Sequence, residues 1–215
     1  MLSAMSACDS SSEIHSGGSV SAPPRLLIHP VGDPRRQEVE SFIRDIYADR
    51  YGADVQQFAP VLASLRDSSG IYAAAGYRSA APGPLFLERY FDAPIESLLA
   101  AHAEPPPARD RIVEVGHLAA SRAGEGRNLI RLLGPHLESM NYEWVVSTLT
   151  TELRHLFVRL GITPLALGRA SLAALGDDAG RWGSYYDHEP VVLAGHLPRA
   201  MAQLARRKAG LAGRV

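Results

Sequence analysis

The order of extended and helical patterns between residues 111 and 167 constrains this fold more than any other feature of the sequence. The apolar run RIVEVGHLAA predicts a strand, and Gly124-Glu125-Gly126 marks a turn into a helix whose apolar residues recur at helical spacing. Strands and helices that alternate in this way build an α/β fold, here a central mixed sheet flanked by helices. The predicted elements are strands at 111–120, 144–150 and 162–167 and helices at 127–140 and 152–160.

The remaining segments are predicted to extend the same sheet. Asp33 and Pro34 open a helix that ends near Tyr51, and the turn at 81–84 joins two strands as an antiparallel hairpin. A further helical segment ends at the three prolines of 105–107. The other predicted elements are strands at 25–29, 70–78, 85–91 and 190–194 and a basic helix at 197–207.

Chain length and composition indicate one globular domain. Domain cores saturate at about 100–200 residues, and this chain has 215 residues, of which 46% are hydrophobic. Residues 1–24 are rich in Ser, Gly and Pro and carry few large apolar groups, which predicts a disordered leader ahead of a single domain at 25–215.

The charge balance and the cysteine content exclude several functional classes. The chain has 22 basic and 23 acidic residues and a net charge of −1, so it lacks the basic footprint of a nucleic-acid-binding protein. Cys8 is the only cysteine, which excludes an internal disulfide and a cysteine metal cluster. Histidines are not clustered either, so no metal is expected.

The N-terminal sequence has no basic region followed by an apolar block, and no segment has the length of a transmembrane helix. The cytoplasm is therefore the predicted location. The basic residues of the last helix form either a solvated face or a contact surface for an acidic acyl carrier protein or an anionic lipid surface. These residues are Arg199, Arg206, Arg207 and Lys208.

Glu114 lies in the middle of the strand predicted at 111–120, among apolar neighbours. Strand alternation places its side chain on the face opposite His117. A carboxylate in such surroundings is costly unless it is paired or used. Glu114 is therefore either a general base or one half of a buried ion pair with Arg78 or Arg89.

Three other polar residues are candidate site residues, each with a structural alternative. Arg78 follows Gly76 at a strand end and is either a clamp for an acceptor carboxylate or a solvated edge charge. Glu88 has the same two interpretations, as a grip for the acceptor or as a solvated charge. His117 is either a proton shuttle or a satisfied structural histidine.

The block WGSYY at 182–186 combines three aromatic residues with small ones. Trp182, Tyr185 and Tyr186 either close one end of the sheet as an aromatic plug or line a substrate site. Ser184 lacks the G-x-S-x-G elbow, so a serine hydrolase is not indicated.

Four blocks together resemble the signature of the thermostable hemolysin family: GYR at 76–78, LFLERY at 85–90, EVGHLAA at 114–120 and WGSYY at 182–186. The resemblance covers about residues 25–195. That family is similar in fold and strand order to GNAT acyltransferases and to acyl-homoserine-lactone synthases, the enzymes that make autoinducers. Strands of those enzymes carry an arginine after a glycine and an acidic residue that begins an E-x-S-R block, and Arg78 and Glu114 correspond to these two residues. Gly116 and His117 stand where the lactone synthases have Ser and Arg, so their substrate recognition is not carried over.

The resemblance implies a thioester-binding site. GNAT enzymes hold the cofactor pyrophosphate on a glycine turn that opens a helix, and Ser121–Gly126 occupies that place. The consensus there begins with Gln or Arg, whereas this chain has Ser121; the alternative is an ordinary tight turn. A GNAT tyrosine returns a proton to the leaving thiolate, which makes Tyr185 or Tyr186 a candidate acid. The cofactor-binding residues so implied are Leu118, whose backbone N–H holds the oxyanion, Ala120, Arg122, Gly124, Gly126 and Arg127.

The leading hypothesis is a GNAT-like N-acyltransferase that moves an acyl group from acyl-CoA, or from the phosphopantetheine of an acyl carrier protein, to a small amine. In this hypothesis Glu114 is the base, and the thioester enters between splayed strands at 112–120 and 144–150. Two other classes stay open. One is a membrane-active lytic protein that depends on the basic helix, and the other is a non-catalytic module that binds acyl groups or carrier proteins.

Overall fold

The computed structural model describes residues 24–122 and 124–212. Within them, a seven-stranded sheet has the order β1-β2-β3-β4-β5-β7-β6. Neighbouring strands are antiparallel except β4 and β5, which are parallel. This is the mixed α/β sheet that the sequence predicts. The strands are β1 (Leu26–Pro30), β2 (Val61–Asp67), β3 (Gly70–Ser79), β4 (Ile112–Ala120), β5 (Trp144–Leu149), β6 (Leu165–Arg169) and β7 (Val191–His196).

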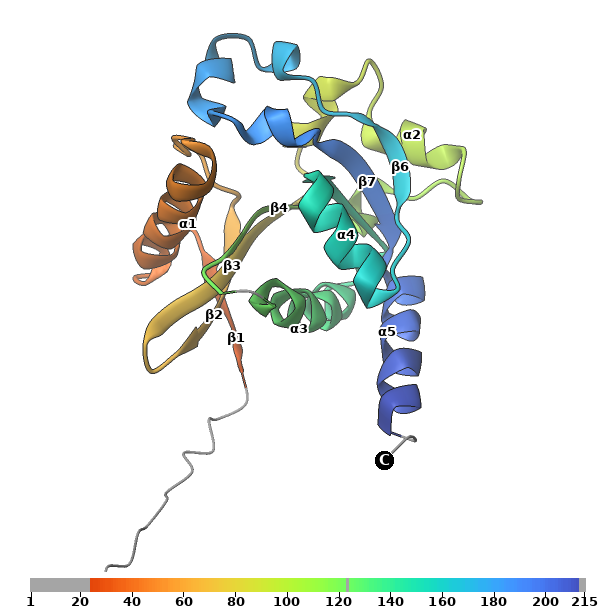
Figure 1. The fold of residues 1–215 in the computed structure, drawn as a ribbon. Coiled ribbons are helices and arrows are strands. Elements are labelled where there is room, and N and C mark those ends of the chain that lie inside the picture. The colour runs from red at the N-terminus through yellow and green to blue at the C-terminus, as the bar shows by residue number, and fades with distance from the viewer. Residues whose placement is uncertain (1–23, 123, 213–215) are drawn as a thin grey trace, which may run out of the picture.

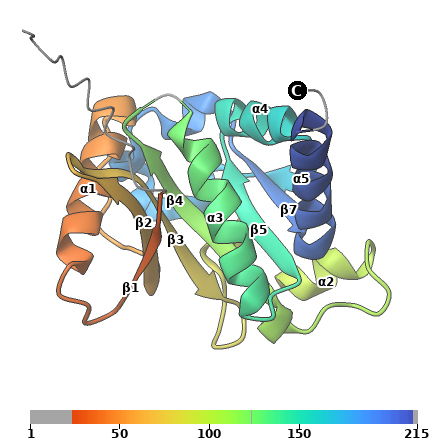
Figure 2. The same cartoon turned by 90° about the horizontal axis from the view of Figure 1, so that it is seen from below.

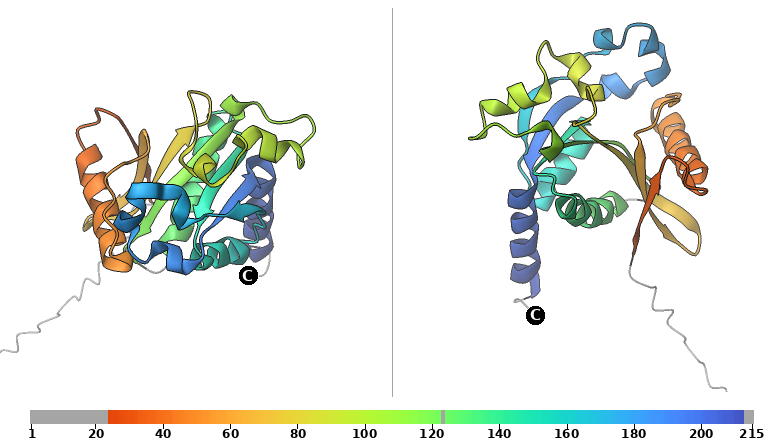
Figure 3. Two further views of the ribbon diagram at one scale, coloured as in Figure 1. Left: turned by 90° about the horizontal axis from the view of Figure 1, so that it is seen from above. Right: turned by 180° about the vertical axis from the view of Figure 1, so that it is seen from behind.

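Helices cover both faces of the sheet (Figure 1). One face carries α1, η1, α2, η3 and η4, and the view from above shows η3 and η4 crossing the sheet beside α1 (Figure 3). The other face carries α3, α4 and α5. The helices are α1 (Arg36–Tyr51), α2 (Ile95–Ala100), α3 (Glu125–Ser139), α4 (Thr151–Leu160) and α5 (Leu197–Ala212), and the 3-10 segments are η1 (Phe86–Tyr90), η2 (Arg109–Arg111), η3 (Leu172–Trp182) and η4 (Tyr185–His188).

Apolar side chains pack on both faces because successive residues of a buried strand point to opposite sides. On β4, Val113 and Val115 pack beneath α3, whereas Ile112 packs with η1 and α2. Val39 and Ile43 of α1 are buried against the opposite face of the sheet from α3.

β4 and β5 separate along their length, and this separation positions the candidate site. Their pairing runs from Ile112↔Trp144 to Glu114↔Val146 and ends there, although β4 continues to Ala120 and β5 to Leu149. On the other side of β4, the register with β3 shifts between Ala74 and Gly76, so that β4 carries one extra residue. A bulge of this kind bends its strand. We call the resulting opening between residues 115–120 and 147–149 the wedge.

The strand predicted at 85–91 and the hairpin that it was expected to form are wrong. Residues 85–91, predicted as a strand, form η1, because the carboxylates of Glu88 and Glu114 accept the N–H groups of residues 85–87 that a ladder would need. The hairpin partner of β3 is instead β2, where no element was predicted. The strand predicted at 162–167 begins only at Leu165. The predicted leader lies, through residue 23, outside the described residues.

Candidate active site

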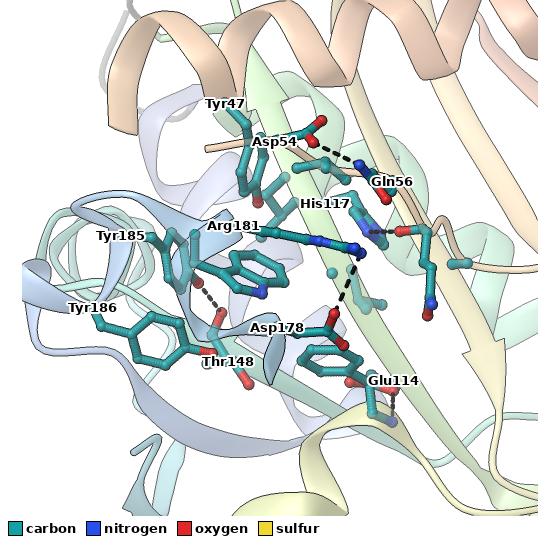
Figure 4. A pocket seen from close by; sticks show the side chains of 18 of the residues that line it. Tyr47, Asp54, Gln56, Glu114, His117, Thr148, Asp178, Arg181, Tyr185 and Tyr186 are labelled. Atoms are coloured by element: carbon teal, nitrogen blue, oxygen red, sulfur yellow. Dashed lines mark hydrogen bonds and ion pairs between the residues drawn. The ribbon is translucent and has the colours of Figure 1, made fainter. Parts of the chain in front are cut away.

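A cavity of about 100 Å³ lies at the wedge on the α1 face of the sheet (Figure 4). We call it the polar pocket. The loop after α1 and the segment η3 close over it, joined by the Asp54 N–H, which donates to the Arg181 carbonyl at 2.7 Å. The lining residues used below are Asp54, Gln56, Gln57, Arg78, Phe86, Tyr90, Glu114, Val115, His117, Leu118, Thr148, Asp178, Arg181, Trp182, Tyr185 and Tyr186.

Glu114 is 8% exposed and lines this pocket. Its Oε2 accepts the Phe86 N–H at 2.8 Å and its Oε1 accepts the Leu87 N–H at 3.1 Å. The Arg78 Nε lies 3.6 Å from Oε2, whereas Arg89, the other predicted partner, donates to the Phe86 carbonyl. Burial raises the pKa of Glu114 overall, against the opposing effect of the two N–H groups and Arg78. Each carboxylate oxygen keeps a lone pair for a substrate proton.

His117 lies on the same face as Glu114, which corrects the prediction from strand alternation. The bulge is the cause, since His117 has a φ of 52° and occupies the extra position of β4. Its Nε2 lies 3.1 Å from the Gln57 carbonyl, so Nε2 carries the hydrogen, and its buried Nδ1 has no hydrogen-bond partner among the described residues. Burial lowers the pKa of His117 to about 4, which makes the ring neutral at pH 7.

The three aromatic residues of the WGSYY block meet in this pocket. The Tyr185 hydroxyl donates to the Thr148 carbonyl at 3.2 Å, and burial raises the pKa of Tyr185 well above its usual value. The Tyr186 and Tyr90 hydroxyls are 2.5 Å apart. The Trp182 ring lies 5.4 Å from that of Tyr185, between centroids. The block is therefore both an aromatic cluster and one wall of the pocket.

Glu88 is the predicted site residue that the fold does not bring to the pocket. Its carboxylate accepts the N–H groups of Leu85 and Ile95 and pairs with Arg109 at 2.8 Å. Burial acts to raise the pKa of Glu88, but Arg109 and these N–H groups lower it overall. Glu88 thus holds η1 in place, and η1 in turn presents Phe86 and Tyr90 to the pocket.

The predicted pyrophosphate loop stands at the open end of the wedge, between the last residue of β4 and the first turn of α3. Gly124 has a φ of 90° directly before α3, and Arg127 is exposed in the first turn. Arg122 pairs with Asp67 at 2.7 Å. The loop residue 123 is outside the described residues. Of the two predicted β4 contacts, Leu118 lines the wedge, and Ala120 pairs with Ala73.

Several polar residues of the pocket were not predicted. The guanidinium of Arg181 pairs with Asp178 at 3.3 Å and extends across the pocket (Figure 4). The one feature of the sequence that could have indicated Arg181 as a pocket residue is its position next to Trp182. Gln56 and Gln57 have no such signal, because the position of their loop depends on how α1 packs.

A second cavity, of about 80 Å³, lies on the opposite face beneath α3, α4 and α5. We call it the apolar pocket, since Ser147 is its one residue with a polar side chain. It shares Val115 and Leu118 with the polar pocket, so the two cavities meet at the wedge. Its other lining residues are Ile130, Leu133, Gly134, Leu137, Val145, Leu149, Phe157, Ile162, Pro164, Leu193, Ala194, Gly195, Leu197, Ala200 and Met201.

The described part of the chain shows neither a metal cluster nor a membrane-spanning helix. In residues 24–122 and 124–212, no three His, Cys, Asp or Glu side chains converge as ligands for an ion. None of the helices there combines the length and apolar character that crossing a bilayer requires.

Solved structures define the fold class as that of GNAT-like acyltransferases. The acyl-homoserine lactone synthase LasI has a TM-score of 0.57 at 14% identity, over 82% of this chain and 91% of that one. FeeM, an N-acyl amino acid synthase from uncultured soil microbes, has a TM-score of 0.58 at 15% identity, over 84% and 96%. BjaI, a CoA-dependent acyl-homoserine lactone synthase crystallised with SAM and isopentyl-CoA, has a TM-score of 0.52 at 12% identity, over 86% and 89%.

The sequence itself identifies the family. The sequence model described as thermostable hemolysin matches residues 29–201. The chain belongs to the thermostable hemolysin family, as its four signature blocks predict. No curated protein sequence matches it.

Proposed function

We propose that this protein is an N-acyltransferase that moves an acyl group from a phosphopantetheine thioester to a small amine. The observation that carries the proposal is the wedge, where β4 and β5 stop pairing after Glu114 and a cavity opens on each face of the sheet. Separated strands expose N–H and C=O groups that need partners. A pantetheine arm, which contains two amides, supplies such partners in the form of an added strand.

The phosphates of the donor would lie at the N-terminus of α3. The helix dipole makes the N-terminus of α3 attractive to anions, and Gly124 and Gly126 allow close approach of the phosphates. Arg127, exposed in that turn, adds a positive charge. Both acyl-CoA and an acyl carrier protein carry this phosphate-linked arm, and the basic C-terminal helix is our proposed contact for the latter.

The two pockets divide the remaining substrate parts by polarity. The apolar pocket would receive the acyl chain, because its walls offer almost no hydrogen-bonding group. The polar pocket would receive the amine, with Arg78 holding an anionic group of the acceptor and Trp182 covering it. The thioester carbonyl would then lie at Val115 and Leu118, which both pockets share.

The proposed reaction forms a carbon–nitrogen bond and breaks a carbon–sulfur bond. The amine nitrogen attacks the thioester carbonyl carbon, and the Glu114 carboxylate takes the proton that the amine loses. The backbone N–H of Leu118 holds the developing oxyanion. As the thiolate leaves, the hydroxyl of Tyr185 or Tyr186 gives a proton to sulfur, and the proton held by Glu114 then passes to that tyrosine, so that both groups regain their starting states. Both hydroxyls are protonated at neutral pH because burial raises the pKa of each tyrosine. His117 is neutral, and its Nδ1 is buried beside Gly76, which supports the structural interpretation of this histidine.

The enzymes with similar structures are named for reactions of the proposed class. LasI and BjaI are acyl-homoserine lactone synthases, FeeM makes N-acyl amino acids, and BjaI binds isopentyl-CoA. Each of these products is an amide made from an acyl group and an amine.

The test measures thiol release and amide formation by the full chain, given acyl-CoA of several lengths and a panel of amino acids and simple amines. We expect free CoA and a mass-detected N-acyl product in equal amounts. The turnover rate should fall in acid as Glu114 becomes protonated, and burial places this fall at a higher pH than for an ordinary glutamate. If the protein consumes no thioester of CoA or of a carrier protein, the proposed enzymatic function is wrong.

A pair of variants separates catalysis by Glu114 from support of η1. Glu114→Gln and Glu88→Gln each replace a carboxylate that accepts two backbone N–H groups, from Phe86 and Leu87 in one case and from Leu85 and Ile95 in the other, but only Glu114 lines the pocket. We expect a loss of about 100-fold or more in kcat for Glu114→Gln. Glu88→Gln should lower the melting temperature, because Arg109 loses its buried carboxylate partner, but it should reduce kcat much less at a temperature where both variants are folded. Equal losses would show that Glu114 has only a structural role.

A further inference from the structure

The wall of the apolar pocket contains one unusually close helix contact. Met201 of α5 packs onto Gly134 of α3, and a Cβ placed on Gly134 would lie 2.6 Å from the Met201 Cε and 2.7 Å from its Sδ. Both residues line the apolar pocket. We infer that Met201, seated on Gly134, is the residue that limits the length of the acyl chain the protein accepts, an inference that rests on the proposed function.

Met201 lies where the end of the apolar pocket farthest from the wedge is expected. Val115 and Leu118 mark the wedge side of the pocket, since the polar pocket shares them. α5 starts at Leu197, immediately after the β7 residue that pairs with Trp144, and Trp144 lies at the closed end of the β4–β5 pairing. The view from below shows α3 and α5 on either side of β5 and β7 (Figure 2). A chain that enters from the wedge therefore runs toward α5.

Met201 also joins two separate groups of packed residues. It contacts the core beneath α3, which includes Leu133 and Leu137, and the smaller group around Leu160 and Ile162 at the end of α4. Its side chain therefore fills the space where these groups meet. Because Met201 also lines the apolar pocket, shortening this side chain would enlarge that pocket.

The sequence of α3 at this point favours the contact. Glycine inside a helix is unfavourable because it has more conformational freedom to lose, yet Gly134 is buried there, next to Pro135 within the helix. The absence of a side chain at Gly134 is what lets Met201 approach. Methionine is unbranched and has three rotatable side-chain bonds, so it can fit chains of slightly different length.

The experiment compares the wild-type chain with Met201→Ala and Met201→Phe over a series of acyl-CoA donors from acetyl to tetradecanoyl. We expect Met201→Ala to move the preferred chain to longer donors and Met201→Phe to move it to shorter ones. Each methylene that gains a buried position should raise kcat/KM by about fourfold. Met140→Ala is the matched control, because Met140 is 46% exposed after α3 and lines neither pocket; its length profile should equal that of the wild type.

Binding of the same donors, measured by calorimetry, gives a readout independent of turnover. The inference predicts that the affinity profile of Met201→Ala shifts to longer chains together with its kcat/KM profile. If the wild type turns over a donor and Met201→Ala keeps the wild-type length profile in both measurements, the inference is wrong and the proposed function stands. If the wild type neither binds nor consumes any donor, both are wrong.

Discussion

At the scale of single residues, His117 shows how one local backbone feature determines a side chain's surroundings. The bulge turns His117 toward Gln57 and Phe58, and Gly76 on the neighbouring strand leaves room for the ring. A Cβ on Gly76 would lie 3.0 Å from the His117 Nδ1. The histidine therefore fits only as a neutral ring, with one hydrogen bond and one unpaired nitrogen.

This arrangement predicts that stability depends on pH. The folded pKa of about 4 lies below the ordinary value of 6.5, so the unfolded chain binds more protons between these values. The free energy of unfolding is then highest above pH 6.5 and falls as the pH drops toward 4. The contribution of His117 is at most about 3 kcal/mol. Urea unfolding at several pH values measures it.

The control for this prediction is His102, an exposed histidine that follows α2. The His117→Gln variant should lose part of the pH dependence, whereas His102→Gln should keep all of it. Identical pH dependence in the wild type and His117→Gln would contradict the assigned environment.

At the scale of elements, the segment from Ala80 to Ala100 depends on one arginine. Arg109 pairs with Glu88 and Glu96 and also donates to the Ala80 and Gly83 carbonyls. This cluster fixes η1, whose N–H groups orient the Glu114 carboxylate. Arg109 is thus a positioning residue for the pocket.

Replacing Arg109 should destabilise the protein strongly. Arg109→Met leaves the Glu88 carboxylate, with only 10% of its side chain exposed, without its cation, and breaking such a buried pair costs about 3 kcal/mol. Arg111→Met is the control, since Arg111 and Glu143 are both exposed and 3.9 Å apart, and such pairs contribute about 0–1 kcal/mol. Denaturant midpoints compare the two. Equal, small effects would mean that the cluster does not hold η1.

Sequence patterns predicted the elements whose periodicity is regular, and failed where distant residues decide the structure. The helices α1, α3, α4 and α5 and the strands β4, β5, β6 and β7 follow apolar spacing and glycine or proline signals, so their existence could be predicted. Residues 85–91 alternate like a strand, but Glu114 captures their N–H groups from another part of the chain. The face of the sheet on which His117 lies could not be foreseen, because alternation assumes a regular strand.

The candidate site could also be predicted only in part. Glu114, Arg78, Trp182 and the two tyrosines of the WGSYY block lie together in the polar pocket. Glu88 was placed there because a charge beside aromatic residues resembles a site residue, and its cation partner, Arg109, is far away in sequence. Asp178 and Arg181 were missed because η3 has no regular pattern to place them.

At the scale of the whole molecule, the sheet separates two chemical environments that meet at a single opening. The α1 face carries the charged and aromatic pocket, and the α3 face carries the apolar one. α5, the predicted basic helix, packs against α3, and its Arg207 donates to the Arg159 carbonyl near the end of α4. Removing α5 would expose the apolar pocket, so its deletion is not a clean test of lytic activity.

The most direct test of the central claim is hydrogen–deuterium exchange of the full chain with and without a saturating acyl-CoA. The account predicts slower exchange in the peptides covering residues 115–128 and 147–150, because the thioester arm fills the wedge and its phosphates cover the start of α3. The account would be contradicted if the donor binds but exchange in both peptides stays unchanged, or if protection appears only in other parts of the chain.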